Sequence, residues 1–128
     1  MSKLHSSLAK VPIKKTDKPW GHELLFVHTS HYAGKLLCIK KGHRLSHQYH
    51  LKKDEAFYLH TGKAQVDLET ADGEKACVIL EPGDALHLVP GIRHRTMALE
   101  DTIIFEVSTA ELDDVVRLSD DYGRTPGK

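Results

Sequence analysis

The chain has 128 residues, a length that fits one domain with a modest hydrophobic core. Its 18 Lys and Arg residues balance 18 Asp and Glu residues, so no excess charge calls for nucleic acid or an anionic membrane as a partner. The N-terminal residues lack the continuous apolar core of a signal peptide, and no stretch is long enough to span a bilayer, so we expect a cytoplasmic protein.

Residues 1–17 are polar, rich in lysine and aperiodic, which predicts a flexible arm or an extension of an edge strand. Residues 18–124 form the predicted domain. From Glu23 onward, eight or nine strand-sized runs alternate with turns that contain Gly or Pro. Asp72-Gly73 lies between two alternating runs and predicts a β-hairpin. Short strands at near-even spacing predict a single-domain all-β fold, a barrel or a sandwich.

One helical pattern follows the last predicted strand. Leu112, Val115 and Val116 recur with helical spacing, and Thr109 is suited to cap the N-terminus. The segment carries acidic residues early and Arg117 late, an order that the helix dipole favours. We therefore expect a short C-terminal helix, placed to cover one end of the barrel.

Ten histidines are many for this length, and residues 45–55 (LSHQYHLKKDE) combine two of them with a glutamine and a glutamate. Side chains alternate along a strand, so Gln48 and His50 share one face with Arg44, whereas His47 points the other way. Glu55 then opens the next predicted strand. If the shared face is the barrel interior, Gln48 and His50 are inward-pointing neighbours.

A more distant histidine, His94, follows the turn Pro90-Gly91 at the start of another predicted strand. With Gln48, His50 and Glu55 it would supply two nitrogen and two oxygen ligands. Such a set suits Zn²⁺, Mn²⁺ or Fe²⁺ and leaves positions open for a substrate, whereas Ca²⁺ prefers oxygen ligands throughout. The alternative is a solvated polar strand and a histidine on a surface turn.

The order of these residues resembles the paired motifs of the cupin superfamily, G-(x)-H-x-H-(x)-E-(x)-G and P-G-x-x-H. Residues 42–62 match the first motif, with Gln48 in place of its first histidine, and residues 83–95 (GDALHLVPGIRHR) match the second. The stretch RLSHQYHLKKDEAFYLHTGKAQV is similar to the segment LSLQxHxxRxEhWxVxxGtAxV of cupin-type mannose-6-phosphate isomerases, domains that also occur fused to mannose-1-phosphate guanylyltransferases. KPWG (residues 18–21) and LDDVVRLSDDYGR (residues 112–124) resemble the entry and tail motifs of those isomerases.

This resemblance implies a cupin domain, a small β-barrel or jelly roll, that holds a divalent cation (Zn, Mn, Fe or Co). The ligands that carry over are Gln48, His50, Glu55 and His94. The chain departs from the family pattern at Lys53, where the family has Arg, and at Phe57, where it has Trp. Further departures are His47, which replaces an apolar residue, and Leu51 and Lys52 after the ligand His50. Barrels of this family commonly pair through edge strands, so the resemblance also implies a homodimer.

Lys53 is the candidate catalytic residue, either as a base that carries a proton or as a cation that faces an oxyanion. Its alternative is a solvated lysine in a turn. The residues assigned to substrate binding are Arg44, Lys35, Phe57 and Arg117. Arg44 could hold a phosphate, or be exposed on its turn, and Arg117 could instead pair with Asp113 or Asp120. His87 and His47 are assigned to the surroundings of the metal ligands, with a core position as the alternative for His87.

Three functions fit these patterns. The first is a metal-dependent sugar-phosphate isomerase that interconverts mannose 6-phosphate and fructose 6-phosphate. Aldose–ketose interconversion needs proton removal next to a carbonyl, and a divalent cation stabilises the enediolate that develops. The second is an iron-dependent cupin dioxygenase. The third is a non-catalytic module that binds a metal and a sugar.

Overall fold

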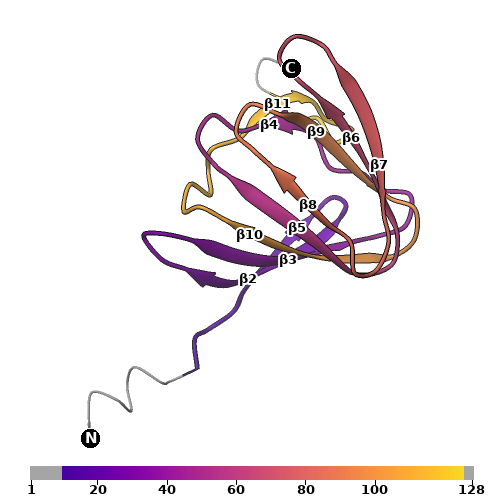
Figure 1. Ribbon diagram of the computed structural model, residues 1–128. Helices are drawn as coiled ribbons and strands as arrows, with labels where there is room; N and C mark the ends of the chain where they lie inside the picture. The colour runs from indigo at the N-terminus through magenta and orange to yellow at the C-terminus, as the bar shows by residue number, and fades with distance from the viewer. Residues whose placement is uncertain (1–9, 126–128) are drawn as a thin grey trace, which may run out of the picture.

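The computed structural model describes residues 10–125, which form two antiparallel β-sheets (Figure 1). The strands of the first sheet are β1 (Lys14–Lys18), β2 (Gly21–His28), β3 (Ala33–Ile39), β5 (Glu55–Thr61), β8 (Ala85–Leu88) and β10 (Thr102–Ser108). The strands of the second are β4 (His47–Tyr49), β6 (Ala64–Glu69), β7 (Lys75–Leu80), β9 (Arg93–Ala98) and β11 (Val116–Ser119). Their spatial orders are β1-β2-β3-β10-β5-β8 and β11-β4-β9-β6-β7. The all-β prediction is confirmed.

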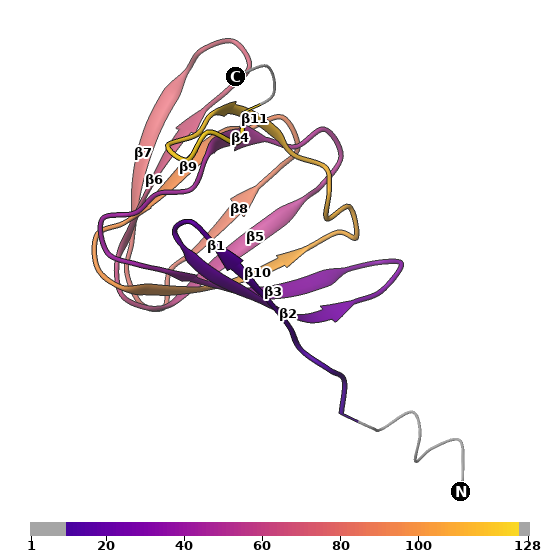
Figure 2. The ribbon, with the colours of Figure 1, turned by 180° about the vertical axis from the view of Figure 1, so that it is seen from behind.

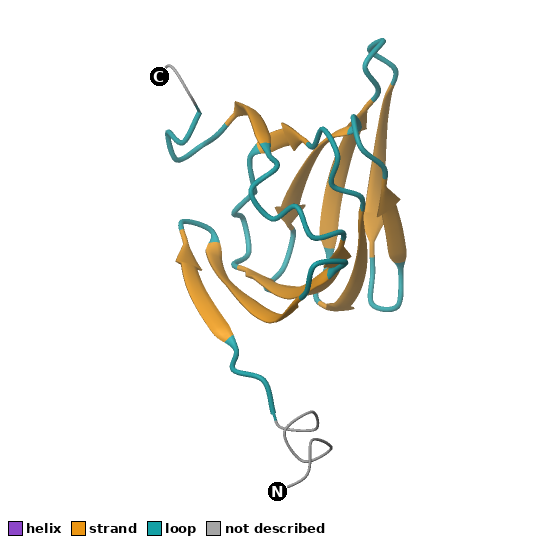
Figure 3. Cartoon of the chain, turned by 90° about the vertical axis from the view of Figure 1, so that its left-hand side faces the viewer, coloured by secondary structure: helices purple, strands orange, loops and turns teal. Residues whose placement is uncertain are grey.

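Most connections carry the chain from one sheet to the other, so strands distant in sequence become neighbours. In the first sheet β10 pairs with both β3 and β5, and in the second β9 pairs with both β4 and β6. The two sheets face each other across one interior (Figure 3). The exceptions are the connections β1–β2 and β2–β3 within the first sheet and the hairpin β6–β7 within the second, whose turn contains Gly73 at a φ of 93°. A left-handed backbone favours glycine, so the hairpin predicted from Asp72-Gly73 is confirmed.

The inner faces of the strands change from apolar to charged along the interior. On β5 the inward residues are Leu59, Phe57 and Glu55, all buried, and on β10 Ile104 is followed by Glu106. Leu59 and Glu55 are four residues apart, which is about 13 Å along a strand. The hydrophobic core therefore fills one end of the interior, and the buried charges gather at the other.

The predicted C-terminal helix is wrong, because residues 112–115 form a turn and a loop that lead into β11. The carboxylate of Asp114 accepts hydrogen bonds from the backbone N–H groups of residues 51–53, at 2.6–3.0 Å. The chain then pairs with β4, with Val116 opposite Tyr49. These hydrogen bonds and the pairing with β4 stabilise an extended chain by more than the weak helical propensity of the segment stabilises a helix.

Part of the predicted N-terminal arm is ordered as a strand. Residues 14–17 form β1 together with Lys18, and β1 pairs with β2 at the edge of the first sheet (Figure 2). The edge-strand alternative thus describes these residues, whereas residues 1–9 of the arm lie outside the described residues. Within residues 10–125, no helix has the length and apolar character that crossing a membrane requires.

Candidate metal centre and substrate cavity

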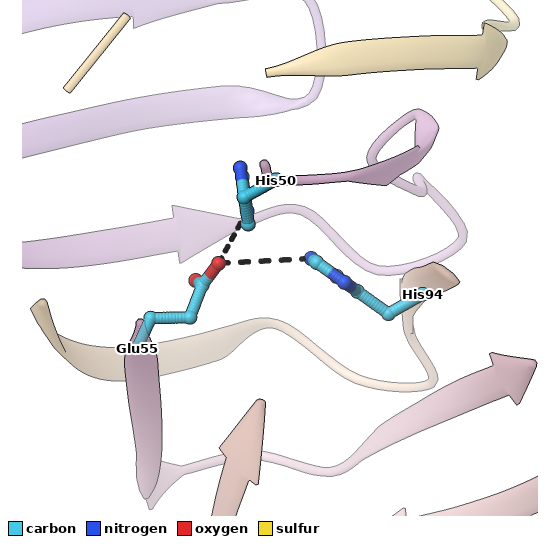
Figure 4. A group of neighbouring side chains, drawn as sticks. All are labelled: His50, Glu55 and His94. Atoms are coloured by element: carbon cyan, nitrogen blue, oxygen red, sulfur yellow. Dashed lines mark ion pairs between the residues drawn. The ribbon is translucent and has the colours of Figure 1, made fainter. Parts of the chain in front are cut away.

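His50, Glu55 and His94 meet at the charged end of the interior (Figure 4). His50 directly follows β4, Glu55 is the first residue of β5, and His94 lies in β9. Each residue is only 3% exposed. One potential ligand atom from each lies within 4.8 Å of the other two. The pairing of β4 with β9, which places Gln48 opposite His94, brings the two histidines together from segments 44 positions apart.

The tautomers of both histidines follow from their backbone contacts. Nδ1 of His50 lies 2.5 Å from the carbonyl oxygen of Asp114, and Nδ1 of His94 lies 3.2 Å from that of Ile92. A carbonyl oxygen only accepts hydrogen bonds, so Nδ1 donates in each case. In the neutral ring Nε2 then carries a lone pair, and both Nε2 atoms point toward Glu55 (Figure 4).

The three converging atoms have no hydrogen-bond partner outside their own group. Among residues 10–125, Nε2 of His50, Nε2 of His94 and Oε2 of Glu55 are all buried, and none is hydrogen-bonded to another part of the chain. Oε2 of Glu55 is in ion-pair contact with Nε2 of His50 and lies 3.9 Å from Nε2 of His94. Three buried acceptors that face one another repel unless a positive charge lies among them. A divalent cation fits this requirement, because two imidazole nitrogens and one carboxylate oxygen are common ligands of Zn²⁺ and Mn²⁺.

The pKa values of Glu55, His50 and His94 are all shifted by burial and by the charges around them. Burial raises the pKa of Glu55, but the hydrogen-bonding contact with His50 and the charge of Lys53 bring it down to about 2. Burial lowers the pKa of His50, but Glu55 outweighs burial and the pKa is raised. The pKa of His94 is lowered, chiefly by burial. The opposite shifts of His50 and Glu55 have one cause, the attraction between a positive imidazole and the carboxylate that it contacts.

Gln48, the fourth predicted ligand, lines the same cavity as His50. Its Oε1 accepts a hydrogen bond from the Ser46 hydroxyl at 2.5 Å. An amide oxygen has two lone pairs, so this contact leaves one free for a cation. The structure brings Gln48 beside the group, and its role as a ligand stays a prediction.

Lys53 is buried and forms an ion pair with Glu106, with Nζ 3.1 Å from Oε2. The solvated-turn alternative for Lys53 is therefore wrong. Burial lowers the pKa of Lys53, but the charges of Glu106 and Glu55 outweigh burial, and the pKa is raised. Glu106 was missed in the sequence, although TIIFEVS carries a signal: Glu106 has the same strand parity as the core residue Ile104.

The inner cavity has a volume of about 100 Å³ and continues into an outer cavity of about 460 Å³. Glu23, another residue missed in the sequence, lines both cavities and accepts hydrogen bonds from Lys35 at 3.3–3.4 Å. Within residues 10–125, five cationic residues but only two carboxylates line the inner cavity. The cations are Lys18, Lys35, Lys53, Arg117 and Arg124. The lining of the inner cavity thus carries an excess of positive charge in a chain whose net charge is zero.

Arg117 lines both cavities, and its Nε is buried without a hydrogen-bond partner in the described part of the chain. The predicted alternative was a pair with Asp113 or Asp120. Asp120 instead accepts two hydrogen bonds at 3.0 Å from the guanidinium of Arg124. Burial and the charge of Arg124 lower the pKa of Arg117. The guanidinium of Arg117 has an unused donor and lies near the guanidinium of Arg124, an arrangement that is suited to bind an anion.

Three predicted site residues are not brought to this cavity. Arg44 forms an ion pair with Asp121 at 2.6 Å and lines a separate groove with His47. His87 lies on the outer surface and contacts Asp54 at 2.7 Å. The alternation from Gln48 back to Arg44 fails because β4 has only three residues and Arg44 lies outside it. Phe57 does lie near the group, with its ring edge-on to His94 at 6.4 Å.

No family model matches the chain. Among curated proteins, the chain is similar to the glucose-6-phosphate isomerase of Thermococcus gammatolerans, with 35% identity over 80 residues. This match covers 59% of the chain and 40% of the relative. The chain therefore spans less than half the length of that protein.

Among solved structures, the chain is similar to KdgF from Halomonas sp., with a TM-score of 0.68, 25% identity and coverage of 78% of this chain and 90% of that one. It is also similar to oxalate decarboxylase from Bacillus subtilis, a protein with Mn(II) centres, with a TM-score of 0.74. That match has 20% identity and covers 89% of this chain and 32% of the other. At this identity the decarboxylase shares the fold alone.

Proposed function

The chain has the cupin fold, and we propose that it is a metal-dependent isomerase that interconverts mannose 6-phosphate and fructose 6-phosphate. The observation that carries the proposal is the set of three unpartnered buried acceptors, from His50, Glu55 and His94, beside a positive cavity. The three acceptors require a cation between them, and the positive cavity favours an anionic substrate. The likeness to a curated glucose-6-phosphate isomerase supports a sugar 6-phosphate.

The residues that would hold the metal are His50 and His94 through Nε2 and Glu55 through Oε2, with Gln48 as the fourth ligand. Held by these residues, a divalent cation would supply Lewis-acid stabilisation of the negative charge that develops when the proton next to the substrate carbonyl is removed. The backbone carbonyls of Ile92 and Asp114 hold the two rings in the tautomer that ligation needs. The three elements that carry the ligands pack on a common core, so the group is held in place before substrate arrives.

Lys53 faces the reacting end of the cavity. Its ammonium group is held by Glu106 at 3.1 Å, which favours the charged form and therefore a role beside an oxyanion rather than as a base. Leu37 and Trp20 line the same cavity and are each 3% exposed, so part of its wall is apolar. An apolar wall lowers the local dielectric constant and strengthens charge–charge contacts with a substrate.

In this proposal, Arg117 and Lys35 would hold the phosphate group. Both line the inner and the outer cavity, so an anion bound between them lies at the entrance while the sugar reaches inward. A dianionic phosphate would use the free Nε donor of Arg117 and offset the excess of positive charge. The same cations would strengthen binding of a phosphorylated sugar over its neutral analogue.

The proposal is tested by metal analysis and by an isomerase assay on the purified chain with added Zn²⁺, Mn²⁺ or Co²⁺. We expect bound divalent metal and formation of fructose 6-phosphate from mannose 6-phosphate, with glucose 6-phosphate assayed alongside. The double variant Glu55→Ala, His94→Ala should lose the metal and on the order of 10³ in rate. His87→Ala, a histidine outside the cavity, is the matched control and should retain both.

Three outcomes would contradict the proposal. Activity that persists in the double variant would show that the group is not the catalytic centre. Tight binding of the sugar phosphates to the metal-loaded protein without turnover would instead assign a non-catalytic binding module. Oxygen uptake with Fe²⁺ would favour a dioxygenase.

A further inference from the structure

The turn between two of the candidate metal ligands is held by a segment that lies 55–63 positions further along the chain. Residues 51–54 connect His50 to Glu55, and each of their four backbone N–H groups donates a hydrogen bond to a side chain of residues 109–114. The N–H groups of residues 51–53 donate to the carboxylate of Asp114, at 2.6–3.0 Å. The N–H group of the fourth residue donates to the Thr109 hydroxyl at 3.1 Å. One carboxylate therefore accepts three consecutive hydrogen bonds from the turn.

The conformation of this turn is the reverse of what its own side chains favour. Leu51 is an apolar residue and is 67% exposed, whereas Lys53 is only 5% exposed. Burial of an apolar side chain is favourable and burial of a charged one is costly, so local preference would exchange these two positions. The ion pair of Lys53 with Glu106 and the charge-assisted hydrogen bonds to Asp114 offset that preference. The path of the chain from His50 to Glu55 thus depends on contacts outside the turn.

The backbone of Asp114 contacts the same group of ligands. Its carbonyl oxygen accepts a hydrogen bond from Nδ1 of His50 at 2.5 Å, while its carboxylate holds the residues that follow His50. Nε2 of His50 is in ion-pair contact with Oε2 of Glu55 at the far end of the turn (Figure 4). Asp114 therefore acts both on the ring orientation of one ligand and on the position of the next.

We propose that Asp114 is a positioning residue of the metal centre, which sets the affinity for a divalent cation by holding His50 and Glu55 in place before the metal binds. The inference rests on the metal centre of the proposed function and is independent of the substrate that is turned over. A four-residue turn without these contacts samples many conformations, and the metal would have to order it on binding. Removal of a residue that orients metal ligands weakens metal binding by about 10–100-fold.

The test is the affinity of the full chain for Zn²⁺, and in parallel for Mn²⁺, measured by titration calorimetry at a temperature at which every variant is folded. Asp114→Ala removes the carboxylate but keeps the backbone carbonyl that contacts His50, and we expect its dissociation constant to be at least about tenfold higher. Asp114→Asn keeps one acceptor oxygen at almost the same volume, so it should give a smaller increase. Circular dichroism verifies folding, and the Asn variant carries the test if the Ala variant does not fold.

Asp101→Ala is the matched control. The carboxylate of Asp101 also accepts a hydrogen bond from a distant backbone N–H group, that of Lys41 at 2.8 Å. Asp101 directly precedes β10, at the apolar end of the interior. If the loss of a bond between a carboxylate and the backbone merely loosened the whole protein, this variant would also weaken metal binding. We expect it to bind Zn²⁺ with the native affinity.

A second measurement uses the metal-free chain. Amide hydrogen exchange of residues 51–53 should be faster in Asp114→Ala than in the native chain, while exchange at His94 in β9 should be unchanged. This difference separates a local loosening of the turn from a loss of stability in the whole domain. Exchange that rises equally in both places would overturn the proposal.

Two results of the titrations would also overturn it. One is equal affinity in the native chain and Asp114→Ala, which would show that the ligands are held without this carboxylate. The other is an equal loss of affinity in Asp114→Ala and Asp101→Ala, which would assign the effect to general destabilisation. A native chain that binds neither Zn²⁺ nor Mn²⁺ would overturn the metal centre together with its positioning residue. That case is distinguishable, because the native chain and the control then fail together.

Discussion

The two ends of the barrel interior are built from the same strands and have opposite chemistry. On β5 and β10 the inward residues at one end are Leu59 and Ile104, both fully buried, whereas at the other end they are Glu55 and Glu106. The apolar end supplies the free energy of burial, at about 25 cal/mol per Å². That stability allows the charged end to keep buried acceptors without partners, which a marginal domain could not support.

The largest loss of stability should come from removing one partner of the buried ion pair between Lys53 and Glu106. Glu106→Leu would leave Lys53 buried and uncompensated, and we expect the free energy of unfolding to fall by about 3–5 kcal/mol. The double variant Lys53→Met, Glu106→Leu should be nearly as stable as the native chain, since both charges are gone. Urea unfolding measures both. Equal destabilisation by the single and double variants would show that the pair, rather than the orphaned lysine, is what matters.

At the apolar end, Leu59→Ala should lower the free energy of unfolding by about 3 kcal/mol, because Leu59 is completely buried and its truncation leaves a cavity. The rate per folded molecule should change little at a temperature where the variant remains folded. The control is Ile79→Ala at a half-exposed position, for which about 0.5–1 kcal/mol is expected. A large loss of turnover in folded Leu59→Ala would show that the two ends are coupled.

Metal binding should distinguish the two ends of the interior, because only the charged end carries the proposed ligands. At a zinc concentration of 100 times the dissociation constant, we expect the native chain to gain about 2.7 kcal/mol of stability, read as a rise in melting temperature. His94→Ala should lose this gain, and His87→Ala should keep it. A similar gain in both variants would place the bound zinc elsewhere.

The smallest effect is expected at the mouth of the cavity. Arg117→Gln removes a guanidinium that faces the cavity, and the KM for the sugar phosphate should rise about tenfold with little change in kcat, since the phosphate does not react. Arg44→Gln, which alters an arginine outside the cavity, should leave both constants near the native values. A fall in kcat without a change in KM would contradict a phosphate-anchoring role.

Much of the site could be predicted because strand alternation and motif order are local. The inward placement of His50, Glu55, His94 and Lys53 follows from these patterns, and the structure gathers the first three. The prediction of a C-terminal helix was wrong because Asp114 accepts hydrogen bonds from residues 51–53 and the residues after it pair with β4. No local sequence pattern reveals these contacts. Arg44 was misassigned to the cavity because alternation was extended past the end of a three-residue strand.

The amino-acid sequence by itself determined most of the strands, their turns and the side chains that a metal would require, because period-two alternation and turn chemistry depend on neighbouring residues. Only the tertiary structure decided which charged residues meet. Glu106 reaches Lys53 because β10 inserts beside β5, and Asp120 takes Arg124 and leaves the Nε of Arg117 without a partner in the described part of the chain. Sheet order depends on the packing of the whole chain, so these contacts cannot be read from any single segment.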